Sequence, residues 1–237
     1  GAYLEDADID ALARIVAKTG LAVHYEAGIG LSAEACAVGP HSEAVGRQAA
    51  RTEFDQTISR LQTAGISVAA MHFDGPFLRL LGDSRKTWSC AETVSAPHGG
   101  GFDVAETVRR ASAYMAELRD LVAEGQPRAP APRVNLLINL TNWQVSGIPR
   151  DRHEGPPTTD LVEVLGHFAR AQAAKGKSGG ARLVISEIVI DYPFSYVKAS
   201  RETFRDRVIH LWNASRHVNG PGEAPSLGVI TNTRALR

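Results

Sequence analysis

The sequence predicts one α/β domain, and we expect it to form most of a (β/α)8 barrel that is incomplete or lacks strands at the chain ends. Three observations predict this class. Helix-like and strand-like apolar patterns alternate along the chain. The segments after the strands are long, whereas those before them are mostly short. The length of 237 residues suits a single barrel, so we treat residues 1–237 as one domain.

Five strand-like segments each follow a helix-like segment. Apolar residues recur at helical spacing between Ile9 and Val16, and Gly20 ends that pattern just before the first strand. The second helical pattern ends with residues 54–65. The three later patterns cover 102–122, 160–176 and 201–218. The strands are expected at 21–26, 66–74, 134–140, 182–191 and 226–232.

Strands that are separated by helices run parallel, and a parallel sheet covered by helices is a closed barrel or an open doubly wound sheet. Long segments follow the first three strands, at 27–41, 75–101 and 141–157. Both architectures place their sites at the carboxyl edge of the strands. Because nearly every loop at this edge is long, we favour the barrel and keep the open sheet as the alternative.

The composition argues against several classes of partner. Lys plus Arg and Asp plus Glu number 26 each, so there is no excess of positive charge for nucleic acid. The apolar run at 183–190 is far shorter than the roughly 20 residues of a membrane-spanning helix. The acidic start at 1–10 indicates either no export or a signal already removed. Secreted and cytoplasmic locations therefore both stay open, as does the oligomeric state.

Acidic residues end three of the five expected strands at the carboxyl edge. They are Glu26, Asp74 and Asp191, and strand alternation places Glu187 on the same face as Asp191 but deeper. Each acid alone could cap a helix or form an ion pair. As a group, facing inward at the edge where barrel enzymes place their chemistry, these four residues are the predicted catalytic set.

Other polar and aromatic residues near this edge are predicted to bind substrate. Two histidines share the inward face, although each could be an ordinary hydrogen-bonded interior residue. Aromatic rings beside carboxylates commonly hold sugar rings, and packing of the loops is the alternative. The predicted binding residues are His24, His72, Asn142, Trp143, Tyr192, Asn232 and Trp88.

The two cysteines, Cys36 and Cys90, lie in the long segments that follow the first two strands. Adjacent parallel strands would bring these segments together, so we predict a disulfide, with two free thiols as the alternative. Neither cysteine has zinc-site spacing. The GKS at 176–178 lacks the first glycine of a phosphate-binding loop. We therefore expect no resident metal and no cofactor for the leading hypothesis.

Three short motifs carry a family resemblance. Glu26-Ala27-Gly28, the segment Met71–Pro76 and the segment Ile190–Pro193 resemble bacterial TIM-barrel proteins of glycoside-hydrolase-like type. The resemblance implies a carbohydrate ligand and hydrolysis. The chain departs from those proteins at Leu140-Thr141-Asn142-Trp143, where they tend to carry an acid after the strand.

The leading hypothesis is therefore a carbohydrate-active enzyme, a glycoside hydrolase that uses paired carboxylates at the barrel rim. One alternative is a divalent-metal sugar isomerase or epimerase, because two strands end in a histidine two residues before an acid, His24-x-Glu26 and His72-x-Asp74. The other alternative is a non-catalytic carbohydrate-binding barrel, which the missing third-strand acid would suit.

Overall fold

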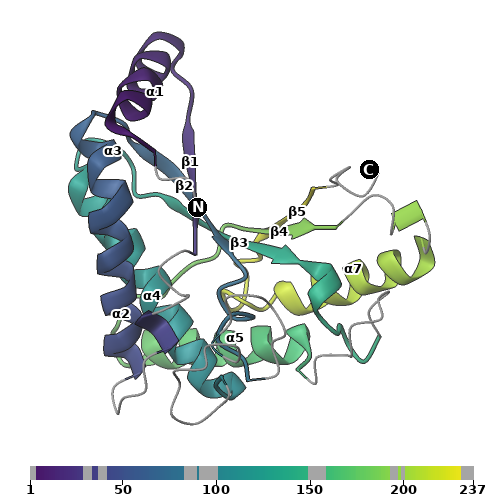
Figure 1. Ribbon diagram of the computed structural model, residues 1–237. Helices are drawn as coiled ribbons and strands as arrows, with labels where there is room; N and C mark the ends of the chain where they lie inside the picture. The colour runs from purple at the N-terminus through teal and green to yellow at the C-terminus, as the bar shows by residue number, and fades with distance from the viewer. Residues whose placement is uncertain are drawn as a thin grey trace.

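A computed structural model describes residues 4–28, 34–36, 42–82, 90, 101–148, 159–192, 197–198 and 201–230. Its strands form one parallel sheet in the order β1-β2-β3-β4-β5 (Figure 1). The predicted alternation of helices and parallel strands is confirmed, whereas closure into a barrel stays a prediction. The strands are β1 (Val23–Ala27), β2 (Val68–Asp74), β3 (Arg133–Asn139), β4 (Glu187–Asp191) and β5 (Ser226–Ile230).

The helices follow the predicted order along the chain. The second predicted helix is a composite, in which a five-residue π-helical segment, Phe54–Ile58, joins α2 (Ser42–Glu53) to α3 (Ser59–Thr63). The α-helices are α1 (Asp6–Thr19), α2 (Ser42–Glu53), α3 (Ser59–Thr63), α4 (Val104–Gly125), α5 (Leu161–Lys177) and α7 (Arg201–Ser215). No helix in the described ranges is long and apolar enough to cross a membrane.

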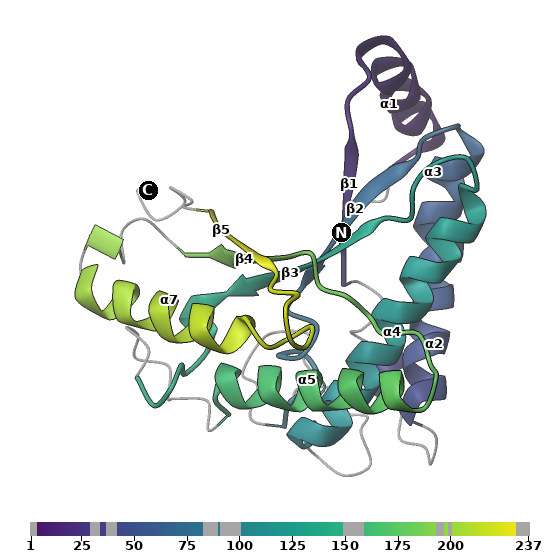
Figure 2. The same cartoon turned by 180° about the vertical axis from the view of Figure 1, so that it is seen from behind.

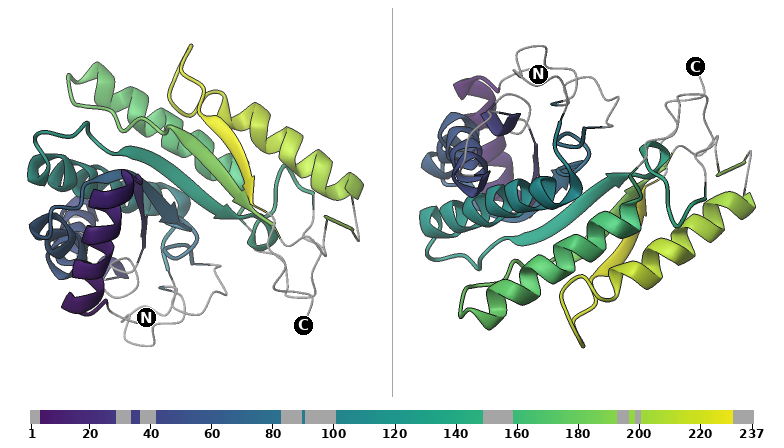
Figure 3. Two further views of the ribbon diagram at one scale, coloured as in Figure 1. Left: turned by 90° about the horizontal axis from the view of Figure 1, so that it is seen from above. Right: turned by 90° about the horizontal axis from the view of Figure 1, so that it is seen from below.

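The helices α2, α4, α5 and α7 lie along one face of the curved sheet, as Figures 2 and 3 show. Alternate strand residues point toward them and form the main core with apolar helix residues. Core side chains from the strands include Met71, Phe73, Leu136, Ile188 and Ile190. The opposite face of the sheet carries most of the polar strand residues, and we call it the open face.

Helix α1 lies apart from this layer, beyond the amino end of β1 (Figure 1). It packs through a small second cluster in which Ile9 meets Leu61 and Ile66. Gly20, with a φ of 68°, ends the helix in the left-handed conformation that glycine adopts without strain. The predicted stop at Gly20 is confirmed.

Side-chain amides secure the amino edge of the sheet. Gln126 donates to the Val68 carbonyl at 2.9 Å and accepts from the Val68 amide at 2.8 Å. Asn219 makes the same pair of bonds with Ile185, at 2.7 and 2.8 Å. Ile185 is therefore bonded to a side chain before the strand begins, and β4 starts at Glu187, later than the predicted 182.

Candidate active site

The open face carries a row of polar side chains that the strand register aligns. Glu26 of β1 lies opposite His72 of β2, His72 opposite Asn135 of β3, and Asn135 opposite Glu187 of β4. Since parallel neighbours in register place their side chains on the same face, all four belong to one layer. The sequence prediction placed Glu26, His72 and Glu187 here but missed Asn135.

Two more predicted acids lie above this row, nearer the carboxyl edge. Asp74 lies two residues beyond His72 on β2 and is in register with Leu137 of β3. Asp191 of β4 is in register with Asn139, which lies two residues beyond Leu137 on β3. The four predicted carboxylates therefore share one face of the sheet at three heights, as strand alternation required.

Hydrogen-bonding contacts link the lower part of this face across four strands. His72 Nε2 lies 3.2 Å from His24 Nδ1, and Asn135 Nδ2 lies 3.4 Å from both His72 Nε2 and Glu187 Oε2. Burial, and then the neighbouring His24, lower the pKa of His72. His72 is therefore a neutral imidazole at neutral pH, able to accept a proton or a hydrogen bond.

The Glu187 carboxylate leans over β5. A β-carbon added at Gly228 would lie 2.8 Å from Glu187 Oε1, closer than real contacts allow. Gly228 thus leaves the space that the Glu187 side chain occupies, and β5 contributes room to the site.

Glu26 and Asp74 have contrasting surroundings at the edge of the sheet. Asp74 Oδ2 forms an ion pair with Arg79 Nη2 at 3.1 Å. Glu26 keeps an exposed surface on the open face, but neighbouring atoms partly remove its carboxyl group from water. This partial burial, and then the negative charges of Asp74 and Asp191, raise the pKa of Glu26, while Arg79 opposes the rise. Glu26 therefore holds its proton to a higher pH than an ordinary glutamate, which is the property of a general acid.

A buried carboxylate supports the end of β1 from behind. Glu53 of α2 accepts hydrogen bonds from the Tyr25 hydroxyl at 2.9 Å, from the Tyr114 hydroxyl, and from the Gly28 amide at 3.3 Å. Burial, and then the charge of Glu53, raise the pKa of both tyrosines, so they stay protonated donors. The Glu26-Ala27-Gly28 segment is thus held by a residue 25 positions later in the chain.

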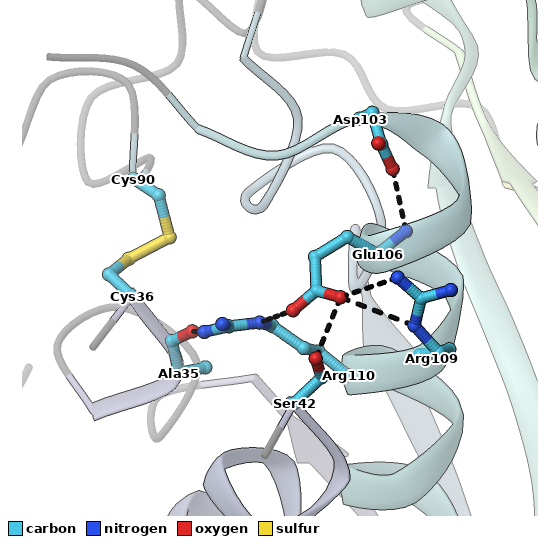
Figure 4. A network of polar contacts seen from close by, with 8 residues as sticks. All are labelled: Ala35, Cys36, Ser42, Cys90, Asp103, Glu106, Arg109 and Arg110. Carbon is cyan, nitrogen blue, oxygen red and sulfur yellow. Dashed lines mark hydrogen bonds and ion pairs between the residues drawn. A yellow bond between two sulfur atoms is a disulfide. The ribbon is translucent and has the colours of Figure 1, made fainter. Parts of the chain in front are cut away.

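The predicted disulfide between Cys36 and Cys90 is confirmed, with 5.3 Å between the two α-carbons. Figure 4 shows how α4 secures the same region. Arg110 donates to the Ala35 carbonyl at 2.7 Å and pairs with Glu106 at 2.5 Å. The segments that follow β1 and β2 are therefore joined covalently to each other and through Arg110 to α4.

Glu106 stays ionised in this network. Burial alone would raise its pKa, but hydrogen bonds from Ser42, Arg110 and Arg109 outweigh burial and lower it. The Arg110 guanidinium also stacks over the Phe102 ring at 3.8 Å. Arg110 is thus a buried cation with a fixed partner, and its role is structural.

The structure does not support two of the predicted substrate-binding residues. Trp143 is 2% exposed and Tyr192 is fully buried, and both rings belong to the main core. The Trp143 carbonyl accepts from Arg207, and the Tyr192 ring packs on Phe204. Since a sugar ring needs an open aromatic face, these two residues are better explained as loop packing.

The remaining predicted binding residues divide into three groups. His24 and His72 lie on the open face, as described above. Asn142 is half-buried beyond the end of β3, and its Nδ2 has no hydrogen-bond partner among the described residues. Trp88 and Asn232 lie outside the described residues, so their predicted roles stay predictions.

Sequence reasoning missed Arg79, Asn135 and Glu53. Asn135 could have been found, because it has the strand parity of the inward-facing residues on β3. A glutamate within an amphipathic helix gives little sign of burial, and Arg79 follows a turn whose path the sequence does not predict. Within the described ranges, no three His, Cys, Asp or Glu side chains are grouped so as to hold a metal ion.

Comparisons with known proteins do not show a family for this chain. No protein-family model matches the sequence, and no curated protein matches it. Among solved structures, the fold is similar to a D-psicose 3-epimerase crystallised in the presence of D-fructose, with a TM-score of 0.40 and 11% identity. That similarity covers 96% of this chain and 70% of the other.

Proposed function

We propose that the protein is a carbohydrate-active enzyme that works by acid–base chemistry, with Glu26 as the acid and Asp74 as its carboxylate partner. The observation that carries the proposal is the contrast between them. The pKa of Glu26 is raised, while Asp74 is held by an ion pair to Arg79, which lies in the segment after β2. A glutamic acid with a raised pKa beside a carboxylate that is paired with a cation suits acid–base chemistry.

In hydrolysis, Glu26 would protonate the glycosidic oxygen as the bond to the leaving group breaks. Asp74 or Asp191 would act as the nucleophile or would activate water. Which of the two acts, and with which stereochemistry, depends on the separation of the carboxyl groups once substrate is bound. The polar row below, with His72, Asn135 and Glu187, supplies donors and acceptors that suit the hydroxyl groups of a sugar.

The second candidate is isomerisation or epimerisation of a free sugar. It is favoured by the neutral His72 imidazole, which lies in one chain of contacts with Asn135 and Glu187. Such a reaction moves a proton to and from carbon next to a carbonyl group, and a neutral imidazole or a carboxylate can serve as the base. Adding or chelating a divalent cation would distinguish the metal-dependent form of this reaction.

The experiment is a substrate screen with two arms. One arm uses aryl glycosides and polysaccharides and measures released reducing ends. The other uses free aldoses and ketoses, with added Mn²⁺ or with a chelator, and measures new sugars by chromatography. Turnover in the first arm supports hydrolysis, and turnover in the second supports isomerisation. Glycan binding without turnover would support the non-catalytic alternative, and neither binding nor turnover would rule out a carbohydrate function.

Matched variants tie any activity to this site. Glu26→Gln removes the proposed acid with almost no change of shape, and its rate should fall by about two to four orders of magnitude. Glu43→Gln removes a half-exposed carboxylate that pairs with Arg47 on α2, and it should leave the rate unchanged. Equal activity in both variants would place the chemistry elsewhere.

A further inference from the structure

We propose that Arg79 is the positioning residue of the site: one guanidinium ties the end of β2 to the end of β1 and thereby sets the arrangement of Asp74 and Glu26. The inference rests on the proposed function, in which these two carboxyl groups act together.

The guanidinium makes two contacts, one with the last residue of β2 and one with the residue just beyond β1. Its Nη2 pairs with Asp74 Oδ2 at 3.1 Å, and its Nη1 donates to the Gly28 carbonyl at 3.3 Å. Gly28 is only two residues beyond Glu26. The planar, forked shape of arginine allows both contacts at once, which a lysine ammonium on a flexible stem does not reproduce.

Gly28 is suited to this approach. A β-carbon at this position would lie 3.2 Å from the Asp74 carbonyl oxygen and 3.9 Å from Arg79 Nη2. Its amide donates to the buried Glu53 from the other side. The backbone after Glu26 is therefore held on one side by Glu53 of α2 and on the other by Arg79 of the segment after β2.

The backbone of Arg79 is itself held. Its amide donates to the Gly75 carbonyl at 3.3 Å, and its carbonyl accepts from the Cys90 amide at 2.8 Å. Cys90 is linked by the disulfide to Cys36, in the segment after β1. The guanidinium thus starts from a fixed backbone, and its side chain is 26% exposed, open to the site on one side.

Arg79 also carries charge that the site needs. Burial, and then the acids Asp74 and Asp191, raise the pKa of Glu26, and Arg79 opposes them. His72, the register neighbour of Glu26, has a lowered pKa and adds no positive charge at neutral pH. Removing the Arg79 charge should therefore raise the pKa of Glu26 further, because its carboxylate form loses a favourable neighbour.

The first test follows the Glu26 carboxyl carbon by NMR across a pH titration, with the signal assigned by its loss in Glu26→Gln. In Arg79→Gln the pKa of Glu26 should rise by about half a unit to one unit. In Arg79→Lys, which keeps the charge, it should stay near the parent value. Arg51→Gln, which breaks an exposed ion pair between α2 and α4, is the control and should not move it.

The second test is kinetic and uses whichever substrate the screen identifies. In Arg79→Gln, kcat should fall about 10- to 100-fold, with the alkaline limb of the pH profile moved upward. Arg79→Lys should restore the position of that limb but only part of kcat, because it cannot hold Asp74 and Gly28 together. A merely structural role would lower stability without moving the pH profile.

The outcomes separate this inference from the proposed function. If Glu26 titrates alike in the parent and in folded Arg79→Gln, as judged by circular dichroism, the inference is wrong. A parent protein that turns over no sugar contradicts the proposed function, and the NMR titration still decides the role of Arg79.

Discussion

The two edges of the sheet are built from different chemistry. At the amino edge, neutral amides bond to the backbone: Gln126 to Val68 and Asn219 to Ile185. At the carboxyl edge, the acids Asp74 and Asp191 act electrostatically on Glu26, and Arg79 forms an ion pair with Asp74.

The difference separates stability from function. The amides of the amino edge are buried and extend the backbone hydrogen bonding, which stabilises the fold without charge. The carboxyl edge brings like charges together on an open face, which costs stability and is typical of an active site. Variants at the two edges should therefore fail in different ways.

The largest effect is expected from Asp74→Asn at the carboxyl edge. The variant should fold normally, melt within a few degrees of the parent and lose two to four orders of magnitude in rate on any substrate found, roughly as for other acid–base residues. Thermal unfolding and steady-state kinetics measure the two quantities. A variant that keeps most of its activity would mean that Asp74 is not part of the chemistry.

The pH dependence of the parent should come next in size. A general acid must be protonated, so the rate should fall about tenfold per pH unit above the pKa of Glu26. Because that pKa is raised, the fall should begin at a higher pH than for an exposed glutamate.

Asp191→Asn removes a negative neighbour, so the Glu26 carboxyl carbon should titrate at a lower pH by NMR. An unchanged titration would remove Asp191 from the site.

Removing the disulfide should weaken the carboxyl edge as a structure. The bond closes a loop with a sequence separation of 54, for which chain entropy suggests about 4 kcal/mol, and disulfides typically stabilise by about 2–4 kcal/mol. The Cys36→Ser/Cys90→Ser variant should show that loss in chemical denaturation. It should also show a lower kcat, because the Cys90 amide holds the Arg79 carbonyl. Equal stability and equal kcat would show that the disulfide is not needed to hold these segments.

The amino edge should show the opposite pattern. Gln126→Ala leaves the amide and carbonyl of the buried Val68 without their partner, at a cost of about 2–4 kcal/mol. The activity of the folded fraction should stay within about twofold of the parent, an effect below roughly 0.5 kcal/mol. Denaturation and kinetics on the same sample measure both. A large loss of kcat with unchanged stability would break the contrast between the edges.

Much of the fold could be predicted because its signals are local. The stop at Gly20, the alternation in Leu21–Glu26 and the acid at the end of Ile66–Asp74 each depend on neighbours in the chain. Parallel strand order then placed Glu26, Asp74 and Asp191 at one edge. The pairing of Cys36 with Cys90 followed from the same reasoning.

The errors and omissions concern burial and long-range contacts. Trp143 and Tyr192 follow strands, as predicted, but position near an edge does not say whether a ring turns outward or into the core. Glu53 gives no sign in the sequence that it will meet Gly28 and Tyr114. Such contacts depend on how α2 and α4 pack together, which local pattern does not decide.

The sequence by itself determined the order of the elements, the parallel sheet and the edge at which its acids gather, because strand period and helix period are set by neighbouring residues. Only the tertiary structure decided how those acids differ. The raised pKa of Glu26 depends on burial and on the nearby Asp74, and the ion pair of Asp74 depends on Arg79, whose guanidinium also reaches the Gly28 carbonyl beyond β1. Electrostatic interactions depend on distance in space, and that distance is fixed only when the strands and the segments after them have packed.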